Sequence, residues 1–174
     1  MKTIEETPTH PANYALISAV YAAALAGTVA ISRRTGESPG GPELLPIGLA
    51  TFTFTRVLTE QKVEEWLRRP FVEEPTPGEK RPRGTGMRYA IGELLSCKRC
   101  SGAWVGLGLV ALRTASPTAG RLAAAVGTVG TVNDVSLAGF AWLTSRANVA
   151  EAEAEQAQEA PAPPVAAAAE RAAA

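Results

Sequence analysis

Residues 11–32 read PANYALISAVYAAALAGTVAIS, and none of these 22 residues carries a charge. An α-helix rises about 1.5 Å per residue, so a helix of this length crosses a hydrocarbon core that is about 30 Å thick. A buried helix of a soluble bundle would show polar residues on an outer face, and this stretch shows only small hydroxyl groups. A cleaved signal peptide fits less well, because Glu5 and Glu6 precede the stretch and two arginines follow it. We therefore expect a membrane-spanning helix.

Three further stretches of the chain are poor in charge. Leu122–Ser145 is interrupted by Asp134 alone, and the weaker stretches Leu44–Leu58 and Cys100–Gly120 hold one arginine each. The sequence therefore predicts an all-α fold, a small multi-span membrane bundle of about four helices over residues 1–146. The chain after Arg146 is rich in Ala, Glu and Pro and has no periodic apolar face. Residues 147–174 are expected to be a disordered tail, helical at most near its start.

The composition excludes several classes of protein. The chain has 17 basic and 17 acidic residues, so no excess of positive charge indicates a nucleic-acid partner. It has one histidine and one aspartate, so most metal sites and the histidine-based catalytic triads lack their parts. Its two cysteines cannot build a disulfide-rich secreted scaffold. We expect no resident cofactor, with zinc open only at the cysteine pair.

Basic residues gather between the second and third stretches, in a loop of residues 59–101 that holds nine of the 17. Basic loops stay in the cytoplasm, so four spans place both termini there as well. Within this loop Val63, Trp66 and Leu67 share one helical face, which is typical of a short interfacial helix with Trp66 at headgroup depth. Residues 74–86 are rich in proline and glycine and are expected to be a mobile linker.

Three runs of the sequence resemble a family of bacterial membrane proteins. They are LATFTFTRVLTEQK at residues 49–62, WLRRPF at 66–71 and GELLSCKRCSGAWV at 92–105. The family is the uncharacterised domain of unknown function 1360, sometimes labelled sporulation-related, and the resemblance covers residues 44–143. Its most specific part is the cysteine pair followed by Gly102 and Trp104, although Lys98 stands where the family has proline. The resemblance implies a small multi-pass protein of the bacterial inner membrane and carries no established activity.

Cys97 and Cys100 have a spacing with chemical content, and four interpretations are open. Zinc needs four ligands, so a second copy of the chain would have to complete the site. A redox-active dithiol is favoured by Lys98 and Arg99, which stabilise a thiolate, although such enzymes usually relay electrons to a second pair. A structural disulfide conflicts with the reducing cytoplasm. The sequence favours the fourth interpretation, a turn in which two small thiols pack and Trp104 lies at the bilayer interface.

Arg56 and Asp134 are charges inside apolar stretches, where an unpaired charge costs about 2.5–3.5 kcal/mol on insertion scales. Each lies about 12 residues into its stretch when the helices begin at Leu44 and Leu122. An ion pair at equal depth would fix the register of the two helices. A proton or ion relay is an alternative, and so is snorkelling of Arg56 to the headgroups.

The sequence as a whole predicts a non-enzymatic membrane protein that scaffolds or recruits a partner through the loop of residues 59–101 or the tail of residues 147–174. A membrane thiol oxidoreductase or metal-binding protein using Cys97 and Cys100 is one alternative. A small transporter or channel component using Arg56 and Asp134 is another. The expected partners are the lipid bilayer and an unknown protein, a second copy of the chain stays open, and no nucleic acid is expected.

Overall fold

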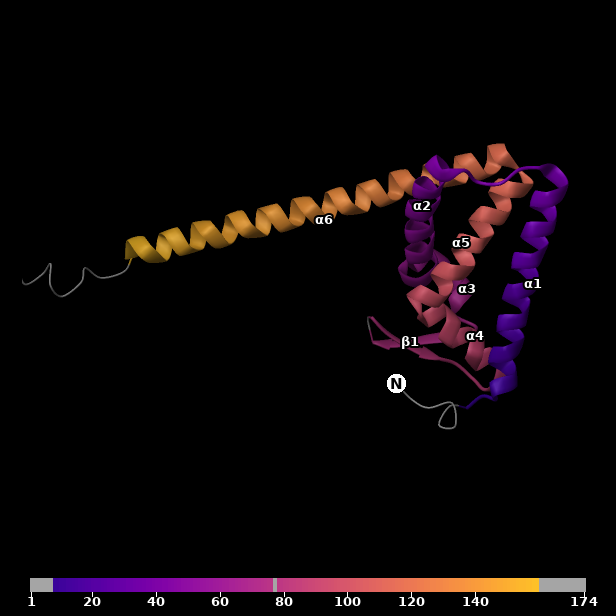
Figure 1. Cartoon of the computed structure of the whole chain (residues 1–174). Helices are drawn as coiled ribbons and strands as arrows, with labels where there is room; N and C mark the ends of the chain where they lie inside the picture. Colours follow the sequence, from indigo (N-terminus) through magenta and orange to yellow (C-terminus); the bar gives the residue numbers. More distant parts are fainter. Residues whose placement is uncertain (1–7, 77, 160–174) are drawn as a thin grey trace, which may run out of the picture. The chain divides into compact units, whose positions relative to one another are not determined.

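The computed structural model describes residues 8–76 and 78–159, most of which are helical (Figure 1). The chain divides into two compact units, residues 1–132 and 133–174. The first unit contains α1 (Pro11–Thr35), α2 (Gly41–Glu60), the 3₁₀ turn η2 (Lys62–Glu64), α3 (Glu65–Arg68), β1 (Val72–Thr76), β2 (Glu79–Pro82), α4 (Gly86–Ser96), α5 (Lys98–Ala115) and the first part of α6 (Pro117–Glu159). The second unit holds the rest of α6. The predicted helical fold class is confirmed, with a small hairpin added.

Proline and glycine set the ends of the long helices. Helix α1 starts at Pro11, where the missing backbone N–H costs nothing, and it stops at Gly36, whose left-handed φ of 71° suits glycine. The Gly36 N–H donates to the Ser32 carbonyl at 2.8 Å. Pro117 likewise begins α6 directly after α5 ends, so the chain turns sharply between these two helices.

Helix α5 is the central helix of the first unit, because it packs against both α1 and α2 (Figure 1). The apolar core is small and consists of Ile47, Ala50, Leu109 and Ala124. A Cβ on Gly127 of α6 would lie 2.5 Å from the Cα of Ala50, so α2 and the first part of α6 approach this closely only because position 127 is glycine. The helices of this unit therefore meet through small residues.

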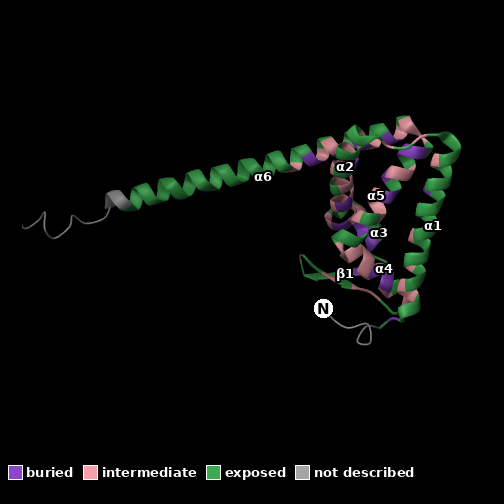
Figure 2. Cartoon of the chain, in the orientation of Figure 1, coloured by how far each residue is buried: buried purple, intermediate pink, exposed green. Residues whose placement is uncertain are grey.

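The distribution of burial is inverted relative to a water-soluble protein (Figure 2). Helix α1 is drawn almost entirely as exposed residues, and Thr28 is its one buried residue. Large apolar side chains are exposed along α1 and α2, among them Leu16 at 54% and Leu45 at 70%. Threonines, small residues and two arginines occupy much of the interior instead.

One helix among the described residues, α1, is long and apolar enough to cross a membrane by length and composition. This agrees with the span predicted over residues 11–32. Helices also form over the other three charge-poor stretches, but none of them has both the length and the hydropathy of a candidate span. In the strongest of the three, the adjacent polar side chains Asn133 and Asp134 lower the hydropathy. The described residues therefore contain one candidate membrane span, α1 at the N-terminus. They do not show a multi-pass arrangement.

Residues 74–86 do not form the mobile linker that their prolines and glycines predicted. Strands β1 and β2 pair in antiparallel fashion, with Val72 opposite Pro82 and Glu73 opposite Arg81. Val72 is buried, and β2 packs against α4, where Gly92 lies directly under Phe71 and Pro82. Burial against α4, the next element along the chain, orders the hairpin and overrides the local propensity.

The helix α6 runs on to Glu159, so residues 147–159 are helical where a disordered tail with a helical start was expected. Alanine, glutamate and glutamine are strong helix formers, and they make up 11 of the 13 residues of this segment. The remainder of the predicted tail, residues 160–174, lies outside the described residues.

Candidate functional site

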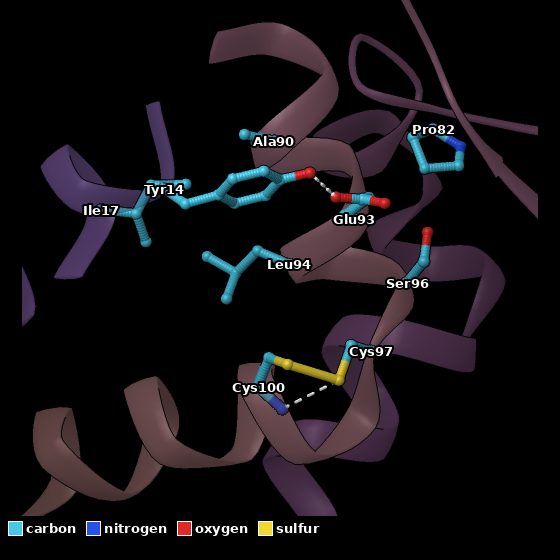
Figure 3. Close-up of a pocket in the computed structure, with 9 residues that line it drawn as sticks. All are labelled: Tyr14, Ile17, Pro82, Ala90, Glu93, Leu94, Ser96, Cys97 and Cys100. Carbon is cyan, nitrogen blue, oxygen red and sulfur yellow. Dashed lines mark hydrogen bonds between the residues drawn. A yellow bond between two sulfur atoms is a disulfide. The ribbon is translucent and has the colours of Figure 1, made fainter. Parts of the chain in front are cut away.

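Cys97 and Cys100 occupy the turn between α4 and α5 (Figure 3). Cys97 caps α5, with extended backbone, and its sulfur accepts a hydrogen bond from the Cys100 N–H at 3.3 Å. The structure joins the two residues by a disulfide, with their Cα atoms 5.3 Å apart. The sequence favoured two packed thiols, and the structure brings the two sulfurs near disulfide distance instead. A cap residue and the residue three positions into the helix lie side by side, within the usual Cα separation of about 4.4–6.8 Å for a disulfide.

A cavity of about 490 Å³ lies beside the disulfide (Figure 3). On one side of it the Tyr14 hydroxyl of α1 donates a hydrogen bond to the carboxylate of Glu93 on α4. The other residues around the cavity are mostly apolar: Ile17, Pro82, Ala90, Leu94, Ser96 and the two cysteines. Sequence reasoning missed Tyr14 and Glu93, because 79 positions separate them along the chain. The site therefore combines a disulfide, an apolar wall and one carboxylate.

Lys98 and Arg99 follow Cys97 in the sequence, and the carboxylate of Glu60 pairs with Lys98 and with a second basic residue, Arg56. Glu60, the last residue of α2, forms ion pairs with Lys98 and with Arg56, whose Nε lies 3.0 Å from the carboxylate. Hydrogen bonds from Lys98 and then from Arg56 hold the pKa of Glu60 below its usual value. Sequence reasoning did not single out Glu60, although Arg56 and Glu60 stand four positions apart on one helix, which is the spacing of a helical ion pair. Arg99 is exposed.

The predicted ion pair of Arg56 with Asp134 stays a prediction, because Arg56 belongs to the first unit and Asp134 to the second. The Arg56 side chain is 38% exposed, and its guanidinium carbon lies 5.8 Å from the centre of the Phe52 ring. Arg56 therefore has a local carboxylate and a local aromatic ring on its own helix.

The two tryptophans predicted at membrane interfaces have different surroundings. Trp66 is 71% exposed, and Val63 and Leu67 on η2 and α3 are exposed as well, so the three residues make up an exposed apolar patch. Its place at a membrane interface stays a prediction. Trp104 packs edge-to-face on Tyr21 of α1, with ring centres 5.2 Å apart. Trp104 thus joins α5 to α1, and Trp66 points away from the described part of the first unit.

A second polar cluster lies at the other end of α2. Arg113 of α5 is buried and donates to the carboxylates of Glu43, at 3.0 Å, and Glu37, at 3.1 Å. Arg121 also donates to Glu43 at 3.0 Å. Hydrogen bonds from Arg113 and Arg121 lower the pKa of Glu43 to about 2. Arg113 was visible in the sequence as the one charge of its stretch, but nothing local indicated its partners.

No group of three or more His, Cys, Asp or Glu side chains in the described part of the chain could hold a metal ion. The cysteine pair supplies two sulfur ligands, so a zinc site there would need ligands from outside these residues.

Comparison with known proteins gives one match. A family model described as "Protein of unknown function (DUF1360)" matches residues 46–138, which is more than half of the chain. The resemblance seen in the sequence over residues 44–143 is thereby confirmed. No curated protein and no solved structure matches the chain.

Proposed function

This chain belongs to the DUF1360 family of proteins of unknown function, and from that premise we propose that it is a four-span protein of the bacterial inner membrane that recruits a protein partner without catalysing a reaction. The spans are residues 11–32, 44–58, 100–120 and 122–145. Both termini and the loop of residues 59–101 face the cytoplasm, and the loop and the C-terminal tail contact the partner.

The inverted burial of the first unit carries this proposal. In water, large apolar side chains move inside and charged or hydroxyl groups stay outside. Here Val20 and Leu25 of α1 are 51% and 48% exposed, whereas Thr114 of α5 is 1% exposed. Lipid tails solvate such apolar surfaces, so exposure of leucine and valine is favourable in a bilayer and unfavourable in water.

The contact between α2 and α5 has the form that membrane helices use. Gly102 and Gly106 stand four residues apart on α5, and a Cβ at either would lie 3.5 Å from Thr55 or Thr51 of α2. Small residues at this spacing let two backbones approach, which replaces the hydrophobic drive that is absent between helices in lipid. A different face of α2 reaches α6, where the hydroxyls of Thr53 and Thr131 share a hydrogen bond at 2.7 Å.

The threonines also satisfy their own hydroxyl groups, as hydrocarbon requires. Thr51 donates to the Ile47 carbonyl at 2.8 Å and Thr59 to the Thr55 carbonyl at 2.8 Å, each one turn back along α2. Because these donors are paired within the helix, neither hydroxyl is left without a partner in the helix contacts.

Charge supports the orientation. Nine basic residues lie in the loop of residues 59–101, and such loops remain on the cytoplasmic side. The exposed patch of Val63, Trp66 and Leu67 lies in this same loop and holds it at the membrane surface, where a partner can reach it.

Single-cysteine labelling of the full chain in intact cells tests the topology. The background is Cys97→Ser with Cys100→Ser, and the reporters are Ser38→Cys, Thr76→Cys and Arg121→Cys, one in each of the three connections between spans. We expect a membrane-impermeant maleimide to label positions 38 and 121 from outside, and position 76 only after lysis. Carbonate extraction of the same membranes should leave the chain in the pellet.

The matched outcomes are distinct. Labelling of all three positions under one condition would mean a single N-terminal anchor and end the four-span proposal. Release of folded chain by carbonate, without detergent, would end the membrane proposal altogether.

A further inference from the structure

We infer that Cys97 and Cys100 form a reversible redox pair that exchanges with a neutral dithiol carried on an aliphatic chain, which binds in the adjoining cavity. The compartment argument rests on the proposed function, because only the four-span topology places the pair in the reducing cytoplasm. A disulfide that forms on that side of the membrane is usually transient, and its role is catalytic or redox-sensing. Because the proposed function includes no catalysed reaction, the pair is assigned as a sensor that is switched by one exchange with the dithiol. The remaining arguments come from the site itself.

The two sulfurs are not equivalent. Cys100 is exposed and Cys97 is half-buried, so an incoming thiolate reaches the sulfur of Cys100 more easily. Cys97 is the better leaving group, since its sulfur already accepts the Cys100 N–H and sits at the N-terminus of the 18-residue helix α5. The exposed cations of Lys98 and Arg99 add to the stabilisation of a thiolate at this position.

The exchange then balances in two steps. The first thiol of the dithiol loses its proton to solvent, and its thiolate attacks the Cys100 sulfur; the sulfur–sulfur bond to Cys97 breaks and Cys97 leaves as a thiolate. The second thiol, also deprotonated, attacks the substrate sulfur of the mixed disulfide and releases Cys100 as a thiolate. The substrate gains an internal disulfide and loses two electrons and two protons, and the cysteine pair gains two electrons and takes up protons from solvent.

The cavity determines which dithiol fits. Its volume of about 490 Å³ lies within the usual range of ligand pockets, about 300–1,000 Å³. Ile17, Ala90 and Leu94 give it an apolar wall that suits an alkyl chain. Glu93 is the one carboxylate around it, so an anionic group at the end of that chain is repelled, whereas a neutral amide is accepted.

The test measures how fast dithiols reduce the oxidised full chain, purified in detergent, with maleimide mass labelling of the released thiols. The probes are dihydrolipoamide, dihydrolipoate and dithiothreitol; the first two differ in one charge, and the third lacks the alkyl chain. We expect dihydrolipoamide to react about tenfold faster than dithiothreitol, because its chain is buried in the cavity. It should also react faster than dihydrolipoate.

Two variants show whether the cavity is responsible. Ile17→Gln should bring the rate with dihydrolipoamide close to that with dithiothreitol. Leu16→Gln, at an exposed neighbouring position of α1, should leave the preference intact. Equal rates for all three dithiols with the unchanged chain would overturn the assignment of the substrate class.

The roles of the two sulfurs have their own readout. With iodoacetamide, the single thiol of Cys100→Ser should be alkylated at lower pH than the single thiol of Cys97→Ser, and the reverse order would overturn the direction of attack. A disulfide that resists all three dithiols while the chain stays folded would overturn the inference as a whole. These assays use protein in detergent, so they decide the redox pair whether or not the labelling experiment supports the topology.

Discussion

Two buried arginines lie at opposite ends of α2, and they are held by different chemistry. Arg68, near the C-terminus of α2, donates to the backbone carbonyls of Leu58 at 2.8 Å and Gln61 at 2.9 Å, and a half-exposed Glu74 carboxylate lies 3.6 Å from its guanidinium. Arg113, near the N-terminus, donates to two glutamate carboxylates instead. Both side chains are at most 5% exposed.

The difference teaches which end responds to solution conditions. Carbonyl oxygens do not titrate, so acid does not remove the partners that Arg68 has in the backbone. Carboxylates do titrate, so the partners of Arg113 are lost when acid protonates them. Acid removes at most the ion pair of Arg68 with Glu74, so the two backbone hydrogen bonds remain as a structural tie. The Arg113 end depends on carboxylates and is therefore the more sensitive to pH.

The largest effect is expected for Arg68→Met. The variant keeps the apolar stem and leaves the carbonyls at the end of α2 without their donor, which should lower the free energy of unfolding by about 3 kcal/mol. Reversible unfolding in mixed detergent with added dodecyl sulfate measures it. The matched control is Arg69→Met at the exposed neighbouring position, where we expect almost no change. If Arg68→Met and Arg69→Met lower the free energy of unfolding equally, the hydrogen bonds of Arg68 do not stabilise the fold.

An intermediate effect is expected in acid at the Arg113 end. The pKa of Glu43 falls from 4.5 to about 2 in the folded chain, because Arg113 and Arg121 donate hydrogen bonds to its carboxylate. A lowered pKa contributes stability that is present above pH 4.5 and is lost as the pH falls towards 2. The unchanged chain should therefore lose more stability between pH 6 and pH 3 than Glu43→Gln does.

The same acid titration sharpens the comparison of the two ends. Arg68→Met should keep the full acid-dependent loss of the unchanged chain, offset by a constant amount. An identical acid response in Glu43→Gln and the unchanged chain would show that Glu43 does not create the difference.

The smallest effect is expected for Glu60→Gln, close to the Arg68 end. Its partners Lys98 and Arg56 are 64% and 38% exposed, and ion pairs of this kind contribute about 0.5 kcal/mol or less. Salt screens exposed ion pairs. The difference in the free energy of unfolding between Glu60→Gln and the unchanged chain should therefore be smaller in about 0.5 M salt than in low-salt buffer. A large loss of stability in Glu60→Gln that does not depend on salt would contradict this, because it would mean that Glu60 stabilises the fold as strongly as the buried arginines do.

Much of the first unit was predictable from local sequence. The uncharged stretch of residues 11–32 predicts α1, since hydropathy and length act within one helix. Gly102 and Gly106 indicate close packing by their spacing alone. The Cys97–Cys100 pair marked the candidate site for the same reason, because both residues lie within a single turn.

Residues whose partners are distant in sequence were not predictable in this way. Arg68 is one of the basic residues of the loop of residues 59–101, and its burial depends on where the chain folds back over the end of α2. The contact of Tyr14 with Glu93, and the burial of Val72 that orders the hairpin, likewise need α1, α4 and β2 to be in place. No periodic pattern in a single segment encodes such contacts.

The sequence by itself determined the helical fold class, the apolar N-terminal helix, the family and the position of the cysteine pair, because each of these depends on residues close together in the chain. Only the tertiary structure decided that a cavity with one carboxylate lies beside the cysteines, and that two arginines are buried with different partners. The physical reason is that these features arise where separate elements meet, and the free energy that fixes them comes from contacts between segments.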